Sequence, residues 1–143
     1  MPTVRTAISD MQTQRIGEVS RIAIGDPDVI PLWFGEPDLD TPDFIRQAAI
    51  DAMQSGQTRY VNKRGIPELR QAILDYTQAQ FGIELDGERI TVTGSGMTAI
   101  MIATETLVNN GDNVVMISPI WPNIFYCPQT MGGESRHVRL DLT

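Results

Sequence analysis

The sequence has few of the residues that most often carry covalent or metal chemistry. Its 143 residues include one cysteine, Cys127, one histidine, His137, and one lysine, Lys63. A lone cysteine cannot form a disulfide within the chain, and no Cys/His cluster has metal-ligand spacing. We therefore expect Cys127 and His137 to be packing residues, and we predict no metal site.

Long apolar runs and an excess of positive charge are also missing. The longest uninterrupted apolar run, residues 99–103, is far too short to cross a bilayer. Charged residues such as Arg5 and Asp10 interrupt the N-terminal segment, which does not read as a signal peptide. The net charge of −7 disfavours a nucleic-acid partner, because binding phosphates needs clustered Lys and Arg. We expect a globular, cytoplasmic protein that binds neither membrane nor nucleic acid.

The first two thirds of the chain are mainly helical by pattern. Apolar residues recur at helical spacing over residues 8–24, 43–56 and 67–82. The second helix is expected to begin with Thr41 as its cap and Pro42 at its first helical position. Residues 30–34 resemble a short strand. The turn-rich segment 35–42 follows, and we place a domain boundary there.

The last third alternates strand and helix patterns. Strands are expected at residues 90–93, 114–117 and 135–140, and helices at 97–108 and 122–131. This order is typical of an α/β fold with a parallel sheet and right-handed crossovers.

The glycine turn Gly94-Ser95-Gly96 follows the first of these strands and opens a helix. Its backbone N–H groups and the helix dipole suit a phosphate group, and the Ser95 hydroxyl can add a donor. A tight turn without a ligand is the alternative. The turn also fits the dinucleotide fingerprint, but that site needs an acid at the end of the next strand. Here that strand ends without an acid, and Asp112 precedes it, so NAD binding is disfavoured.

Four blocks of sequence together resemble one enzyme family. They are GEPDLDTP at residues 35–42, YVNKRGIPELR at 60–70, VTGSG at 92–96 and SPIWPN at 118–123. In this order and spacing, over residues 8–143, they resemble class I/II pyridoxal-phosphate-dependent aminotransferases, the aspartate-aminotransferase-like branch of fold type I. One block alone would be weak, whereas the four together are specific.

The resemblance implies a role for six residues. The cofactor phosphate would be held by Ser95, Gly96 and Met97, the last through its backbone N–H only; some members of the family carry threonine at this position. Trp121 would stack on the pyridine ring, Tyr60 would donate its phenol to the phosphate across a homodimer interface, and Gly35 would lie beside the substrate α-carboxylate. Without the resemblance, Gly35 reads as a turn glycine, Tyr60 as a packing residue and Trp121 as a core residue.

The resemblance also implies a domain plan and an incomplete site. Residues 1–42 would form an N-terminal arm and small-domain segment, and residues 43–143 the first βαβαβ part of the cofactor-binding large domain. The family's reactive lysine, the acid that pairs with the pyridine nitrogen and the carboxylate-binding arginine would all follow this region. Lys63 lies in a polar, basic loop without the desolvation that activates a lysine.

The chain is therefore expected to be a fragment that contains no catalytic residue, is inactive alone and leaves apolar faces uncovered. The leading hypothesis is transamination between an amino acid and a 2-oxo acid by the full-length protein. The alternatives are a non-catalytic relic that binds a phosphate ligand or a partner and, less favoured, a fragment of an NAD-binding dehydrogenase.

Overall fold

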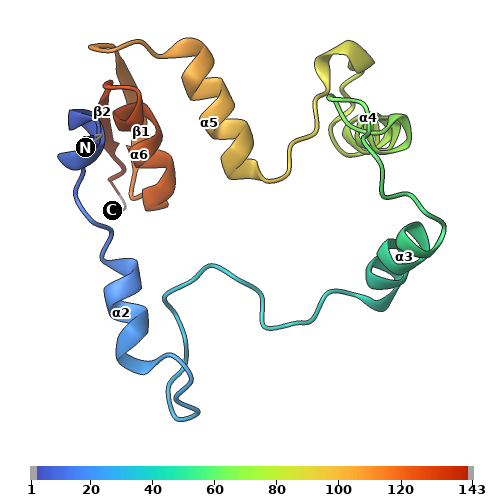
Figure 1. Ribbon diagram of the computed structural model, residues 1–143, viewed down its shortest axis with the longest axis horizontal. Helices are drawn as coiled ribbons and strands as arrows, with labels where there is room; N and C mark the ends of the chain where they lie inside the picture. The colour runs from blue at the N-terminus through green and yellow to red at the C-terminus, as the bar shows by residue number, and fades with distance from the viewer. Residues whose placement is uncertain (1–2, 142–143) are drawn as a thin grey trace. The chain divides into compact units, whose positions relative to one another are not determined.

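The computed structural model describes residues 3–141, which form two compact units. The sheet unit joins residues 3–33 to residues 94–141, and the helical unit is Phe34–Thr93. The sheet unit contains α1 (Thr6–Ser9), α2 (Ile16–Ala23), α5 (Gly96–Leu107), β1 (Asn113–Ser118), α6 (Pro122–Thr130) and β2 (Glu134–Arg139) (Figure 1). The helical unit contains α3 (Asp43–Gln54), α4 (Pro67–Phe81) and the 3-10 helix η1 (Gly87–Arg89).

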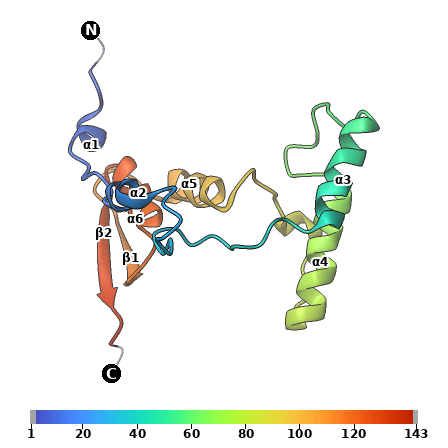
Figure 2. The ribbon, with the colours of Figure 1, turned by 90° about the horizontal axis from the view of Figure 1, so that it is seen from below.

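A β-α-β motif forms the centre of the sheet unit. Strands β1 and β2 are parallel, with a register from Asn113 opposite Glu134 to Ser118 opposite Arg139, and Figure 2 shows both arrows pointing the same way. Helix α6 connects the strands and packs on both, while α1 and α5 pack on α6. The structure confirms the predicted parallel pairing of the strands. It also confirms the helices predicted at residues 97–108 and 122–131, which are α5 and α6.

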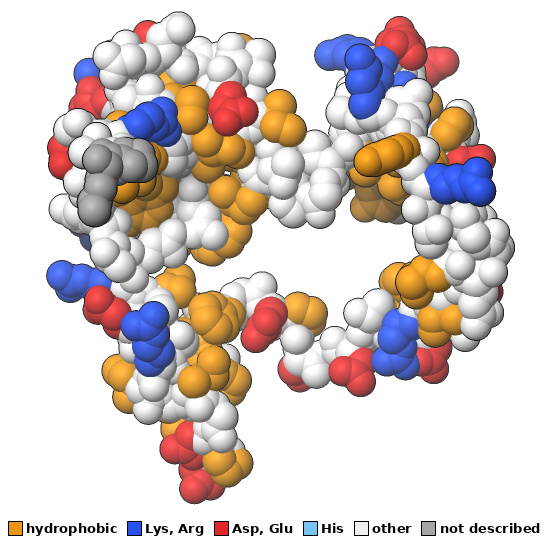
Figure 3. Space-filling model, in the orientation of Figure 1, with side chains coloured by type: hydrophobic (Ala, Val, Ile, Leu, Met, Phe, Trp, Pro, Cys, Tyr) orange, Lys and Arg blue, Asp and Glu red, His pale blue; other side chains and the backbone are white. Residues whose placement is uncertain are grey.

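The core of the sheet unit is small. Met116 on β1 and Cys127 on α6 are 7% and 4% exposed. Alternate β1 residues point away from this core, so Val115 and Ile117, together with Val138 on β2, form an uncovered apolar face of the sheet. Apolar side chains reach the surface in both units (Figure 3). The expectation of uncovered apolar faces is confirmed.

The two helices of the helical unit follow local sequence signals closely. Helix α4 begins at Pro67 and ends before Gly82, whose φ of +65° is the left-handed geometry that glycine adopts readily. Helix α3 begins at Asp43, but the predicted Thr41 cap is wrong. Pro42 is the residue before the helix, and its carbonyl, without any side-chain cap, accepts the N–H groups of Ile45 and Arg46.

The single helix predicted over residues 8–24 is wrong, because it is two short helices separated by a non-helical segment. In that segment the Gln14 amide donates to Asn123 on α6, and just before α1 the Arg5 guanidinium donates to the Thr130 carbonyl at 3.0 Å. These tertiary hydrogen bonds outweigh the weak helical propensity of the polar residues between α1 and α2.

The strands predicted at residues 30–34 and 90–93 are not formed within the described residues. Pro31 lacks the N–H that a ladder needs, and the chain bends at residues 33–34. In the second segment, the Val92 N–H donates to the Arg64 carbonyl at 3.0 Å instead of to a neighbouring strand. The second miss arises because a strand depends on a partner that local sequence does not reveal.

None of the helices within residues 3–141 has the length and hydropathy needed to span a bilayer.

Candidate functional site

The start of α5 has the geometry of an anion site. Ser95 precedes the helix in extended conformation, and its Oγ accepts the Thr98 N–H at 3.1 Å. The first amides of any helix, here those of Gly96 and Met97, have no acceptor within the helix. The first turn of α5 contains no acidic residue that would repel an anion. The positive end of the helix dipole therefore acts unopposed at this turn.

The two glycines of the turn leave room for a ligand. A Cβ atom added to either Gly94 or Gly96 would meet no heavy atom within 4 Å. Neither glycine has a positive φ, so backbone strain does not require glycine here. What glycine provides is an uncovered backbone that a phosphate group could approach closely.

Thr98 belongs to this turn, although the sequence motif did not single it out. Its Oγ1 lies 3.0 Å from Ser95 Oγ, so two hydroxyls stand together at the helix start. The sequence did contain a signal for Thr98, because a serine followed three residues later by a hydrogen-bonding side chain resembles a capping box. The Met97 side chain is half-buried, which leaves the backbone N–H as its polar contribution.

Trp121 lies beyond the carboxyl end of β1. The strand ends at Ser118, a cis Ser118–Pro119 peptide follows, and Trp121 is the last residue before α6. Its side chain is 50% exposed, so the interpretation as a buried core residue is wrong. A ring in this position is accessible to a flat ligand, and open α/β sheets bind ligands beyond the carboxyl ends of their strands.

A cavity of about 720 Å³ lies at the same end of the sheet. Its lining includes Ser118, Pro119 and the β2 residues His137 and Arg139. His137 is exposed, its Nδ1 is hydrogen-bonded to the Ser118 hydroxyl, and its ring centroid lies 4.6 Å from that of Phe125. His137 therefore packs against Phe125, in line with the expectation, although its side chain is exposed. Cys127 is buried, as expected, and burial raises the pKa of its thiol.

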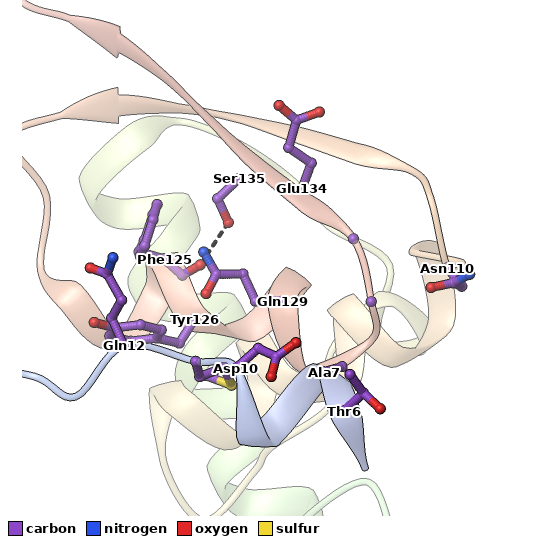
Figure 4. A pocket seen from close by; sticks show the side chains of 13 residues that line it. Thr6, Ala7, Asp10, Gln12, Asn110, Phe125, Tyr126, Gln129, Glu134 and Ser135 are labelled. Carbon is purple, nitrogen blue, oxygen red and sulfur yellow. Dashed lines mark hydrogen bonds between the residues drawn. The ribbon is translucent and has the colours of Figure 1, made fainter.

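A second cavity, of about 740 Å³, lies at the opposite end of β2 (Figure 4). It is lined by α1, α6 and the first residues of β2, among them Asp10, Phe125 and Gln129. The Ser135 hydroxyl beside it donates to the Phe125 carbonyl at 2.7 Å. None of the six predicted site residues lines this cavity, so it is separate from the glycine turn and from Trp121.

Gly35 and Tyr60 belong to the helical unit, whereas Ser95, Gly96, Met97 and Trp121 belong to the sheet unit. Tyr60 is fully exposed, so within the described chain it is not a packing residue. Gly35 is exposed and lacks a positive φ, and an added Cβ would meet open space. Lys63 is exposed in the loop after Tyr60, as its polar surroundings predicted.

Arg64 and Glu88 were not singled out from the sequence, yet they organise the loop that carries Tyr60. The Arg64 guanidinium donates to the Glu88 carboxylate and to the backbone carbonyls of Glu88 and Ile90. The partners are 24 and 26 residues apart in the chain. No local spacing rule could have found this pairing.

Comparison with known proteins places the chain among aminotransferases. The family model described as aminotransferase class I and II matches residues 27–142. Aspartate aminotransferase of Pyrococcus horikoshii is 34% identical over 132 residues, which are 92% of this chain and 33% of that protein. The probable aspartate/prephenate aminotransferase of Rhizobium leguminosarum bv. phaseoli is 43% identical over 94 residues, which are 66% of this chain and 24% of that protein.

Solved structures agree. The crystal structure of the aspartate aminotransferase from Rhizobium meliloti matches 99% of this chain and 36% of its own, with a TM-score of 0.88 and 30% identity. The predicted fold class is confirmed, since the helices and strands match part of a fold-type-I aminotransferase. The chain spans about a third of the length of these relatives, and it belongs to the class I and II aminotransferase family.

Proposed function

We propose that this chain carries the phosphate- and ring-binding part of a pyridoxal 5′-phosphate site. The supporting observation is the start of α5, where Ser95 caps the helix and the open backbone at Gly94 and Gly96 meets an unopposed helix dipole. The donor set fits the group: two backbone amides and a hydroxyl suit a phosphate dianion, and an accessible indole suits an aromatic ring.

Each residue has a separate task in this proposal. The amides of Gly96 and Met97 and the Ser95 hydroxyl bind the phosphate, while Trp121 covers one face of the ring and excludes water from it. Across the homodimer interface, Tyr60 donates its phenol O–H to the phosphate held by the partner subunit, and Gly35 lets the substrate carboxylate approach the backbone. Bound there, the cofactor supplies an aldehyde that accepts an amino group and a ring that takes up electrons from the substrate α-carbon.

The protein to which this chain belongs would then transfer an amino group from an amino acid to a 2-oxo acid. Its relatives' names support this reaction class. We further propose that it works as a cytoplasmic homodimer, with residues 1–42 as arm and small-domain segment and residues 43–143 as the start of the large domain. No residue of this chain is assigned the covalent step, since Lys63 lies exposed in a polar loop.

Ring binding is tested with the fluorescence of Trp121 in a Trp33→Phe background, which leaves it as the only tryptophan. Saturable quenching by pyridoxal 5′-phosphate is expected, because stacking brings the ring against the indole. A Trp33→Phe chain without saturable quenching at millimolar cofactor would refute the ring site.

Activity is tested by replacing the matched third of the Pyrococcus horikoshii aminotransferase with this chain. A correctly folded chimera that produces no 2-oxo acid would contradict the assigned reaction.

The chain alone should not transaminate. Formation of a 2-oxo acid by the chain with cofactor and an amino acid, abolished by Lys63→Ala, would overturn this expectation. Nothing in the described residues favours the phosphate-binding relic or the NAD-binding alternative over the aminotransferase, and the family match gives neither any support.

A further inference from the structure

Arg64 joins the loop that carries Tyr60 to the segment at residues 88–92. Besides the Glu88 carboxylate and carbonyl, its guanidinium reaches the Ile90 carbonyl at 3.2 Å and Thr91 Oγ1 at 3.4 Å. The Arg64 carbonyl in turn accepts the Val92 N–H. Its side chain is 25% exposed, so these charge-assisted bonds are partly shielded from water. One residue therefore fastens two segments that are far apart in sequence.

The loop around Arg64 is itself a defined turn. Asn62 Oδ1 accepts the Arg64 N–H at 2.9 Å, and the Asn62 carbonyl accepts the Gly65 N–H at 2.8 Å. Gly65 has a φ of +99°, and a Cβ there would lie 2.8 Å from Val92 Cβ. The turn thus lies directly against residue 92 and leaves no space between them.

Glu88 is shared between two arginines. Its carboxylate pairs with Arg64 and lies 3.6 Å from the guanidinium of Arg70 on α4, which also donates to the Gly87 carbonyl. The Glu88 side chain is 75% exposed, so solvent weakens the ion pairs themselves. The hydrogen bond from Arg64 to the Ile90 carbonyl is part-buried, so solvent weakens it less than it weakens the ion pairs.

Tyr60 depends on this connection for its position. Its side chain is fully exposed, and within the described residues its phenol has no hydrogen-bond partner. Only the backbone of the loop can hold it in place, and that loop is fixed four residues later at Arg64.

We propose that Arg64 is a positioning residue for the phosphate end of the cofactor site, acting through Tyr60. This rests on the proposed function, which assigns the Tyr60 phenol and the Gly94-Ser95-Gly96 turn to the cofactor phosphate. Arg64 touches neither cofactor nor substrate. It orders the Tyr60 loop before the phosphate binds, so binding does not have to bear that ordering cost.

The test compares two probes that differ only in the phosphate: pyridoxine 5′-phosphate and pyridoxine, which have no aldehyde to react with amines. In the full chain, Arg64→Ala should weaken binding of pyridoxine 5′-phosphate about tenfold, the scale of one ordered loop side chain. Binding of pyridoxine should change less than about twofold, since the ring site is untouched. Arg64→Lys keeps the positive charge but loses the several N–H donors of the guanidinium, so its affinity for pyridoxine 5′-phosphate should lie between those of the wild type and Arg64→Ala.

Two controls separate positioning from loss of structure. Arg46→Ala removes an ion-paired arginine elsewhere in the helical unit, which bonds to Asp43 on α3, and should change neither affinity. In a Tyr60→Phe background, Arg64→Ala should have no further effect, because both changes remove the same contact. The proposal would be overturned if the losses in affinity caused by Tyr60→Phe and Arg64→Ala were fully additive. Equal losses in affinity for both probes in Arg64→Ala would also overturn it.

Amide hydrogen exchange separates failure of this inference from failure of the proposed function. Arg64→Ala should speed exchange at the Val92 and Gly65 amides, whatever ligand is present. Unchanged exchange there would show that Arg64 does not hold the loop. If the wild-type chain binds both probes equally, the phosphate site fails and the positioning role fails with it. Faster exchange in Arg64→Ala would then still confirm the structural connection.

Discussion

The Gly65→Ala substitution should lower the free energy of unfolding of the helical unit more than the same substitution at any other glycine of that unit. A φ of +99° costs an L-residue about 1–2 kcal/mol. The new Cβ would also lie 2.8 Å from both Cβ and Cγ2 of Val92, closer than real Cβ contacts occur. Overpacking of this kind typically costs about 1–3 kcal/mol. The expected total loss in the free energy of unfolding is about 2–5 kcal/mol.

Gly56→Ala is the matched control. Gly56 has a φ of +77° in the same unit, but an added Cβ there meets open space. It should therefore lose only the backbone term, about 1–2 kcal/mol. Urea unfolding is followed by far-UV circular dichroism, whose helical signal includes that of α3 and α4, and the two variants should differ by about 1–3 kcal/mol. Equal losses for Gly65→Ala and Gly56→Ala would refute the close approach of the loop to Val92.

Three further outcomes are expected. Ser95→Ala removes the cap of α5 and should cost about 1 kcal/mol in urea unfolding, whereas Thr106→Ala on the exposed side of that helix should cost under about 0.5 kcal/mol; equal losses would contradict the cap. Iodoacetamide should label Cys127 slowly until urea is added, because the thiol is buried and its pKa is raised, and rapid labelling of the folded chain would contradict the packing of α6. Ile117→Lys, on the uncovered face of the sheet, should reduce self-association in sedimentation velocity, while Met116→Lys, in the core, should unfold the sheet unit; unchanged association after Ile117→Lys would contradict the role of that face.

Elements whose signals are local were predictable from the sequence. Helix α4 shows this best, since Pro67 and Gly82 mark its two ends by backbone geometry alone. The glycine turn before α5 was found in the same way. Elements that depend on distant partners were not predictable. Residues 90–93 have a strand-like pattern, but the Ile90 carbonyl and the Val92 N–H bond to Arg64.

The residues of the candidate site show the same difference between local signals and contacts with distant parts of the chain. Ser95 and Gly96 were identified because a glycine turn that opens a helix has a sequence signature, and Trp121 because residues 118–123 resemble an aminotransferase block. The Arg64–Glu88 connection has no such signature, because it depends on how a loop and a segment 24 residues later fold together. Sequence reasoning thus found the groups proposed to touch the ligand and missed the group proposed to position one of them.

The central claim is that the start of α5 binds the cofactor phosphate. Backbone amide shifts in a titration of the ¹⁵N-labelled chain with pyridoxine 5′-phosphate test it most directly. We predict that the largest shifts occur at Gly96 and Met97 and are lost in Ser95→Asp, which places a negative charge at the helix start. Shifts concentrated at residues of the other cavity, such as Gln129, with Gly96 and Met97 unchanged, would contradict the claim.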